Sequence, residues 1–120
     1  MAIGAAKGQF IAPAEVGVYG VSVTPGVIIV GSDNGSASSP VAYSNVINGV
    51  GPFTYLWTIQ QSASGDISIR TPTKANTQFT ASGFNTDYFG IATITVTDLG
   101  RGSAETSTDI SVQFIFENFN

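Results

Sequence analysis

The 120-residue sequence contains no cysteine and no histidine. Without cysteine the chain has neither a disulfide nor a thiolate metal ligand, and without histidine it has no imidazole base. Charged residues are scarce as well, at 10% of the chain against roughly 25% in average soluble domains. These absences remove most of the side-chain chemistry that enzymes and metalloproteins use, so we expect no catalytic residue, no metal ligand and no cofactor.

The charge balance excludes two further classes of partner. Four basic and eight acidic residues give a net charge of −4, and the basic ones are scattered: Lys7, Arg70, Lys74 and Arg101. Nucleic acids and anionic membrane surfaces both need a concentrated basic patch, so neither is expected as a partner. No apolar run approaches the roughly 20 residues of a membrane-spanning helix. Residues 1–10 hold one lysine and no sustained apolar stretch, so no secretory signal is predicted and the chain is expected to have no export route of its own.

Val, Ile, Thr, Ser, Asn and Gly are abundant instead, and they suit pleated strands and tight turns. In residues 90–98 the apolar side chains Ala92, Ile94 and Val96 alternate with threonines, so that the two kinds point to opposite faces of a strand. Residues 53–59 place three aromatic side chains on one face, and residues 106–116 place Ile110, Val112, Phe114 and Phe116 on one face. Turn signals separate such segments at about 8–12-residue spacing, and no segment has the period of an amphipathic helix. The pattern predicts an all-β, immunoglobulin-like (Ig-like) sandwich of about 7–9 strands. Its predicted core comprises Val41, Tyr55, Trp57, Ile94, Val96 and Val112.

Residues Pro52 to Phe114 carry a set of motifs in the order that Ig-like domains of bacteria and phages show. They are Tyr55-Leu56-Trp57, then Phe79, then a Gly-initiated strand from Gly90 to Val96-Thr97-Asp98, then Gly100. About half of the chain thereby resembles the bacterial and phage Ig-like superfamily, especially its PKD-like branch, as found in tailed-phage virion proteins. The resemblance implies a fold and says little about function.

The resemblance also implies roles for individual residues. Trp57 would lie centrally between the sheets, with Val41, Ile94 and Phe114 filling the space that a disulfide occupies in antibody-type domains. Tyr88 stands near the place of a tyrosine corner, in which a hydroxyl ties a loop to the backbone.

The two ends of the sequence are apolar. Residues 1–13 are small and nearly uncharged, and we interpret them as an arm preceding a domain of residues 14–120. The arm either frays or orders against a neighbouring subunit. Residues 114–120 run to the end of the sequence with apolar side chains on both strand faces at 114–116. This predicts a solvent-facing edge that pairs with another chain, unless Ile115 and Phe119 fold back against the sandwich. The run at residues 27–30 predicts a strand that is buried on both faces or lies at a subunit contact. The candidate contact residues are Phe10, Ile11, Val27, Ile28, Ile29, Phe114, Ile115, Phe116 and Phe119.

Several aspartate, asparagine and aromatic residues are further candidates for a site, and ordinary turn chemistry also accounts for the acidic ones. Asp87 and Asp98 could pair as acid and base, but both lie at strand ends, where aspartate usually caps a turn. The oxygen donors Asp33, Asn34 and Asp98 could bind Ca²⁺, but they lack the dense spacing of a dedicated loop. Three aromatic side chains stay uncommitted and could stack on a sugar: Tyr19, Tyr43 and Phe84.

A virion is the context that matches these features and the resemblance. Secreted Ig-like modules normally come in tandem behind an export signal, whereas virion proteins are made in the host cytoplasm and released by lysis. We therefore expect a complete short chain that works as a non-enzymatic phage structural protein, a capsid decoration or cement protein. Its partners would be the major capsid protein or sister copies in a homo-oligomeric assembly, with host-surface glycans as a further class. The alternatives are a tail or neck accessory protein, and a carbohydrate- or cell-surface-binding module.

Overall fold

The computed structural model describes residues 18–63 and 65–118. These residues form ten strand segments and one short 3₁₀ turn, so the all-β prediction is confirmed. In chain order the elements are β1 (Gly20–Thr24), β2 (Val27–Asp33), β3 (Gly35–Ser38), β4 (Ala42–Ile47), β5 (Phe53–Gln61), β6 (Ile67–Ile69), β7 (Asn76–Thr77), β8 (Phe79–Gly83), β9 (Thr86–Asp98), η2 (Leu99–Arg101) and β10 (Ala104–Glu117).

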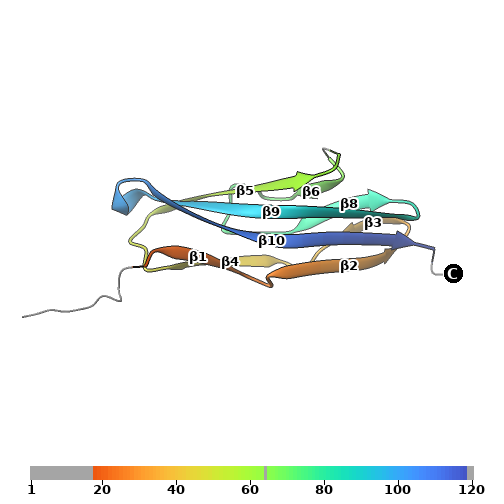
Figure 1. Cartoon of the computed structure of the whole chain (residues 1–120), viewed down its shortest axis with the longest axis horizontal. Helices are drawn as coiled ribbons and strands as arrows, with labels where there is room; N and C mark the ends of the chain where they lie inside the picture. The colour runs from red at the N-terminus through yellow and green to blue at the C-terminus, as the bar shows by residue number, and fades with distance from the viewer. Residues whose placement is uncertain (1–17, 64, 119–120) are drawn as a thin grey trace, which may run out of the picture.

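One layer of the sandwich is a four-stranded sheet in the order β2-β10-β9-β5. The antiparallel pair β9 and β10 runs the length of the sandwich and is joined at one end by η2 (Figure 1). β5 pairs with β9 in antiparallel fashion, whereas β2 runs parallel to β10. Parallel pairing follows because the chain crosses from β1 to β2 at Pro25-Gly26 and changes layer there.

The second layer consists of two adjoining three-stranded sheets, β1-β4-β7 and β3-β8-β6. β3 and β4 are successive parts of one strand path, and β7 and β8 are the antiparallel path beside it. The layers enclose a core whose buried members include Trp57, Phe79, Ile94, Val96 and Val112. The Ig-like β-sandwich that the sequence predicts is therefore present.

Trp57 occupies the centre that the resemblance assigns to it. Its ring meets the ring of Phe79 edge-on, with centroids 5.9 Å apart, and its indole N–H donates to the carbonyl of Lys74 at 2.9 Å. Tyr55, on the same face of β5, is half-buried and packs against the core. Aromatic and aliphatic packing thus fills the space between the sheets.

The prediction for Val41 is wrong. Val41 is only half-buried, while Ala42 is fully buried and Tyr43 is exposed, so β4 turns the opposite face inward. The reason is an extra residue between β3 and β4: Ser38 lies opposite Thr80, but Ala42 lies opposite Thr77. This bulge contains Pro40, which cannot donate to the ladder, and it shifts the alternation by one residue.

Tyr88 forms the predicted tyrosine corner. It stands near the start of β9, and its hydroxyl donates to the carbonyl of Ser82 at 3.0 Å, six residues upstream. Its ring packs edge-on against the buried ring of Phe116, with centroids 6.0 Å apart. The corner fixes the turn between β8 and β9 to the core of the sandwich.

Candidate interaction surface

Asp87 and Asp98 stand near opposite ends of β9 (Thr86–Asp98). Eleven residues of extended strand separate them, which corresponds to roughly 36 Å. Two carboxylates must lie within about a nanometre of each other to share an acid–base reaction of the glycosidase type. The two side chains therefore cannot act as a pair on one substrate.

Asp98 has a structural role at the η2 end of the sandwich. Its buried carboxylate accepts hydrogen bonds from the backbone N–H groups of Val50 at 2.8 Å, Gly51 at 2.9 Å and Gly100 at 3.0 Å. Burial disfavours ionisation, but these three donors, with Arg101 nearby, outweigh it and hold the pKa of Asp98 below its ordinary value. We call this arrangement the Asp98 latch, because it ties the loop before β5 to the turn after β9.

The candidate Ca²⁺ ligands are not brought together. Asp33 lies opposite Glu117 on β10, whereas Asp98 lies opposite Ala104, thirteen residues away on the same strand. That separation is roughly 43 Å. The side-chain amide of Asn34 accepts a hydrogen bond from the backbone N–H of Asn85 at 2.8 Å and donates one to the Asn85 side-chain oxygen at 3.1 Å. Within residues 18–63 and 65–118, no group of three or more acidic side chains could hold a metal ion.

Part of the predicted contact set is wrong. Phe114 and Phe116 are fully buried and stack on each other in the core, and Ile28 is buried as well. β10 is not an edge strand, because it lies between β2 and β9. The alternation of a strand explains the error: a run that is apolar at every position still sends alternate side chains to opposite faces. Phe10, Ile11 and Phe119, like the arm of residues 1–13, lie outside the described residues.

The remaining predicted contact residues share the outer face of the four-stranded sheet. Val27 and Ile29 are 59% and 63% exposed on β2, and Ile115 is half-buried on β10 beside them. The register adds two residues from β9: Ile29, Gln113 and Phe89 form one row, and Val27, Ser111 and Ile91 form the next. We define the apolar patch as Val27, Ile29, Phe89, Ile91 and Ile115.

Phe89 and Ile91 were not anticipated from the sequence. Both belong to β9, whose inward set Ala92, Ile94 and Val96 was recognised, and both lie in the opposite phase of that alternation. Phe89 is 54% exposed although it is aromatic. The signal was present in the sequence, because a strand with one apolar face predicts polar side chains on the other face. Phe89 and Ile91 are therefore two large apolar residues on a face of β9 where polar side chains are expected.

The same sheet face is polar away from the patch. Its outward side chains near β5 are mainly threonines and serines: Thr54, Thr58, Thr93, Thr95, Thr97 and Ser107. Thr93 donates to the carboxylate of Asp109 at 2.7 Å, as expected of a solvated surface. The apolar residues therefore gather at the β2 side of the sheet, and Leu56 is an isolated exception on β5.

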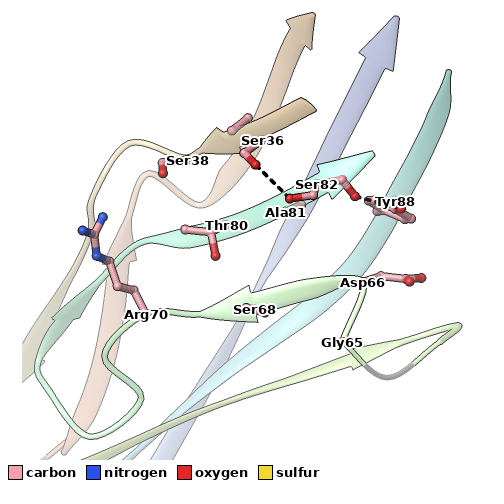
Figure 2. A pocket seen from close by; sticks show the side chains of 11 residues that line it. Ser36, Ser38, Gly65, Asp66, Ser68, Arg70, Thr80, Ala81, Ser82 and Tyr88 are labelled. Atoms are coloured by element: carbon pink, nitrogen blue, oxygen red, sulfur yellow. Dashed lines mark hydrogen bonds between the residues drawn. The ribbon is translucent and has the colours of Figure 1, made fainter. Parts of the chain in front are cut away.

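The opposite layer has a hollow on its outer face, over β3, β8 and β6 (Figure 2). Its volume is about 580 Å³, and five of its eleven lining residues are serines or threonines: Ser36, Ser38, Ser68, Thr80 and Ser82. Asp66 and Arg70 stand at its borders, and Arg70 donates to the side chain of Gln78 at 3.1 Å. Tyr88 is the only aromatic residue among the lining residues, and its hydroxyl is already bonded to Ser82.

The three uncommitted aromatic residues do not line this hollow. Tyr43 and Phe84 are exposed elsewhere, on β4 and on the corner before β9. The ring of Tyr19 is covered by the guanidinium of Arg101, which lies 5.4 Å from the ring centroid. The described residues thus supply the hollow with hydroxyl groups but with no exposed ring face on which a sugar could stack.

Comparison with known proteins reveals a shared fold. No protein-family model and no curated protein sequence matches the chain. Among the residues that the structure describes, no helix is long and apolar enough to cross a membrane. A chain titled as a nucleoside hydrolase-related hypothetical protein from Saccharophagus degradans that is associated with carbohydrate metabolism aligns with 75% of this chain over 22% of its own length, at 18% identity and a TM-score of 0.48.

The more extensive likeness is to PapD-like domain 7 (an ASH / PapD-like domain) of human CEP192, with a TM-score of 0.61. The alignment covers 100% of this chain and 99% of that domain, at 9% sequence identity. At such low identity the likeness concerns the fold alone. The chain is accordingly an Ig-like β-sandwich related in architecture to PapD-like domains.

Proposed function

We propose that this protein is a non-enzymatic structural protein of a phage virion, a capsid decoration or cement protein built on an Ig-like domain. The observation that carries the proposal is the apolar patch. Exposed apolar groups that lie together on a protein surface commonly mark a site of protein contact. The patch residues come from three neighbouring strands of one sheet face, and the two β10 residues that lie between its β2 and β9 members, Ser111 and Gln113, are polar but uncharged.

The shape of the patch supports a protein partner. It lies on the face of a pleated sheet, which offers a broad surface and no enclosed cavity for a small ligand. Phe89 and Ile29 provide large apolar anchors, and the Thr-rich part of the same face provides a polar rim. An apolar centre with a polar border is the usual composition of a protein interface.

The arm of residues 1–13 provides a second proposed contact. The chain enters the sandwich at Val18, whose carbonyl accepts a hydrogen bond from Asn48 at 2.8 Å. That point lies at the η2 end, where the Asp98 latch fixes the surrounding loops. A segment that leaves a rigid anchor can reach a neighbouring subunit while the body stays in place. Tail or neck location within the virion is the alternative placement of the same kind of protein.

A carbohydrate-binding module is the second candidate, and the hydroxyl-lined hollow favours it. Hydroxyl groups both donate and accept hydrogen bonds, and Asp66 and Arg70 add an acceptor and a donor at the borders. We rank this candidate below the first because the hollow offers no exposed aromatic face.

Capsid binding tests the proposal. Purified protein is added to capsids that lack it, and bound protein is measured together with the temperature at which the capsids lose their DNA. We expect the protein to bind at high copy and to raise that temperature. Phe89→Lys, in the patch, should reduce binding at least tenfold, whereas Thr95→Lys, on the polar part of the same strand, should leave binding unchanged.

Two results would overturn the proposal. One is a wild-type protein that neither binds capsids nor occurs in purified virions. The other is binding that Phe89→Lys and Thr95→Lys reduce equally. A specific glycan-array signal that is lost in Ser68→Trp, which fills the hollow, would favour the carbohydrate-binding module instead.

A further inference from the structure

We propose that two copies of this chain pair through their β2 strands, antiparallel and edge to edge, and join two four-stranded sheets into one of eight strands. The inference rests on the proposed function in one respect, since it identifies a sister copy as one partner of the apolar patch. Its basis is an open sheet edge that carries patch residues, in contrast to a second edge that the chain itself partly covers.

β2 is an open edge. One of its sides pairs with β10 over seven residues, from Val27 to Asp33. On its other side, the described part of the chain supplies no strand and no backbone hydrogen bond to these seven residues. The unpaired N–H and C=O groups of such an edge are satisfied by a further extended strand. The other strands that end a sheet in the second layer are shorter, at five residues or fewer: β1, β3, β6 and β7.

The opposite edge of the same sheet, β5, is partly covered by the chain itself. The backbone N–H of Trp57 donates to the carbonyl of Pro72 at 2.7 Å. The side-chain amide of Gln61 both accepts from the N–H of Ile67 at 2.8 Å and donates to its carbonyl at 3.0 Å. The segment that follows β5 thereby bonds to one backbone group and one side chain of that strand. The β5 edge is thus partly covered, whereas among the described residues the β2 edge is open.

β2 also lacks the features with which edge strands usually prevent pairing. It contains no lysine and no proline, and its single charged residue, Asp33, stands at the last position. Natural edges of this length are usually interrupted by an inward-pointing charge, a proline or a bulge. The sequence Val27-Ile28-Ile29-Val30 instead favours strand pairing at every position.

A two-fold axis perpendicular to the sheet pairs the two β2 strands so that their core-facing side chains lie on one side of the joined sheet and their solvent-facing side chains on the other. Such an axis keeps the core face of each copy on the same side, so opposed residues must belong to the same phase of the alternation. With Ile29 opposite Ile29, Val27 lies opposite Gly31 and Asp33 lies opposite Pro25, beyond the strand. Like charges are therefore not opposed, which removes the main electrostatic obstacle to pairing.

The same axis joins the two apolar patches. Val27 and Ile29 of each copy lie at the junction, and Phe89, Ile91 and Ile115 continue the apolar surface on either side. Backbone hydrogen bonds then determine the geometry of the pair, and burial of apolar side chains stabilises it. A joined patch on one face of the eight-stranded sheet would present a doubled surface to a capsid.

Sedimentation velocity and light scattering at micromolar concentration test the pairing. We expect the wild type to be a dimer and Ile29→Lys to be monomeric, with at least a tenfold rise in the dissociation constant. Leu56→Lys is the matched control, because Leu56 is also exposed (49%) on the outer face of the other edge strand. This control should remain dimeric. Circular dichroism and melting curves verify that both variants are folded.

Amide hydrogen exchange provides a second measurement that does not depend on size. In the dimer the amides of β2 should be protected on both sides, so residues 27–33 should exchange more slowly at high than at low protein concentration. In Ile29→Lys that concentration dependence should be lost. Slow exchange that is independent of concentration contradicts the pairing.

Three results would overturn the inference: a monomeric wild type, a dimer that Leu56→Lys disrupts and Ile29→Lys does not, and a dimer that forms only after residues 1–13 are deleted. The last result would mean that the arm occupies the β2 edge. Capsid binding is scored separately. A dimer that does not bind capsids contradicts the proposed function alone, whereas a monomer that does bind them contradicts this inference alone.

Discussion

At the η2 end of the sandwich an ionised side chain holds the connecting loops, whereas at the opposite end neutral amides and a hydroxyl hold them. The first end depends on the Asp98 latch, in which one carboxylate accepts three backbone hydrogen bonds. At the second end Asn34 and Asn85 bond to each other through their amides, and Tyr88 bonds to the carbonyl of Ser82. Three such hydrogen bonds therefore hold the loops at each end. The acceptor is a charged carboxylate at the η2 end, whereas all the bonded groups are neutral at the other end.

This difference determines how each end responds to its surroundings. A buried carboxylate stabilises the fold only while it is ionised, so the η2 end is sensitive to acid. The bonds at the other end join neutral groups and do not titrate in the same range, so these bonds are insensitive to acid. The chain enters the sandwich at the η2 end, where the Tyr19 hydroxyl lies 3.1 Å from the carbonyl of Ala104 and 3.2 Å from that of Val96. The end that the Asp98 latch holds is thus also the end at which Tyr19 is tied to β9 and β10.

Removal of the latch should have the largest effect. In Asp98→Ala the N–H groups of Val50, Gly51 and Gly100 lose their acceptor, and we expect the melting temperature to fall by roughly 10 °C. Differential scanning calorimetry measures the change. Asp109→Ala is the control, since Asp109 is exposed on β10 and its carboxylate accepts a hydrogen bond from the hydroxyl of Thr93 at 2.7 Å. Equal losses in the two variants would contradict a special role for the latch.

Acid should weaken the two ends unequally. Because the folded-state pKa of Asp98 is depressed, its stabilisation is fully present above the unfolded-state value near 3.8 and is lost as the pH falls through the lower folded-state value. We expect the difference in melting temperature between wild type and Asp98→Asn to be constant above about pH 5 and to shrink below it. As the pH falls, the hydrogen-exchange protection factors of amides near Asn48 should decrease before those of amides near Asn85. Simultaneous loosening of both ends would contradict the comparison.

At the end opposite η2, loss of one hydrogen bond should destabilise the fold less than removal of the Asp98 latch. Tyr88→Phe removes the hydroxyl that bonds to Ser82 but keeps the ring against Phe116, so we expect a loss of about 1 kcal/mol in the free energy of unfolding. Urea denaturation measures it, and the loss should be the same at pH 7 and pH 4. Tyr43→Phe, at an exposed position on β4, should change nothing. A pH-dependent loss in Tyr88→Phe would show that this end is not neutral in its behaviour.

The smallest effect concerns the exposed Arg101. Its guanidinium stacks on Tyr19 and donates to the carbonyl of Asn48 at 3.1 Å, both at the surface. Exposed contacts of this type contribute about 0.5 kcal/mol. Arg101→Gln should therefore reduce stability by about that amount, and the reduction should diminish in high salt. A loss as large as that of Asp98→Ala would assign the latch to Arg101 rather than to Asp98.

The sequence predicted those parts of the fold that depend on simple alternation. Residues 90–98 and 106–116 each alternate so that apolar side chains share one predicted face, and the structure buries Ile94, Val96 and Val112 of that face as predicted. Val41 was assigned to the wrong face because an extra residue at Pro40 shifts the phase, and a shift of one residue leaves the apolar pattern almost unchanged. Register between strands is a property of two segments, so one segment alone cannot determine it.

The candidate surface was predicted only in part, for a related reason. Val27, Ile29 and Ile115 were recognised as contact residues because they belong to apolar runs, but so do Phe114 and Phe116, which are in the core. Phe89 and Ile91 belong to the patch because β9 lies two strands from β2, and this strand order cannot be read from the sequence of β9 alone. The role of Asp98 was predicted as a turn cap, and its side chain does accept from Gly100, but its bonds to Val50 and Gly51 span nearly half the chain. Such long-range contacts leave no local pattern.

The parallel arrangement of β2 and β10 has a mechanical consequence. The chain enters the body at the η2 end and β10 finishes at the opposite end, so tension between residues 18 and 118 pulls these two strands past each other along their length (Figure 1). Seven residue pairs then carry the force together in shear, and their hydrogen bonds cannot open one after another as in a peeled hairpin. The β2–β10 pair should therefore resist separation under such tension more than a hairpin of equal length.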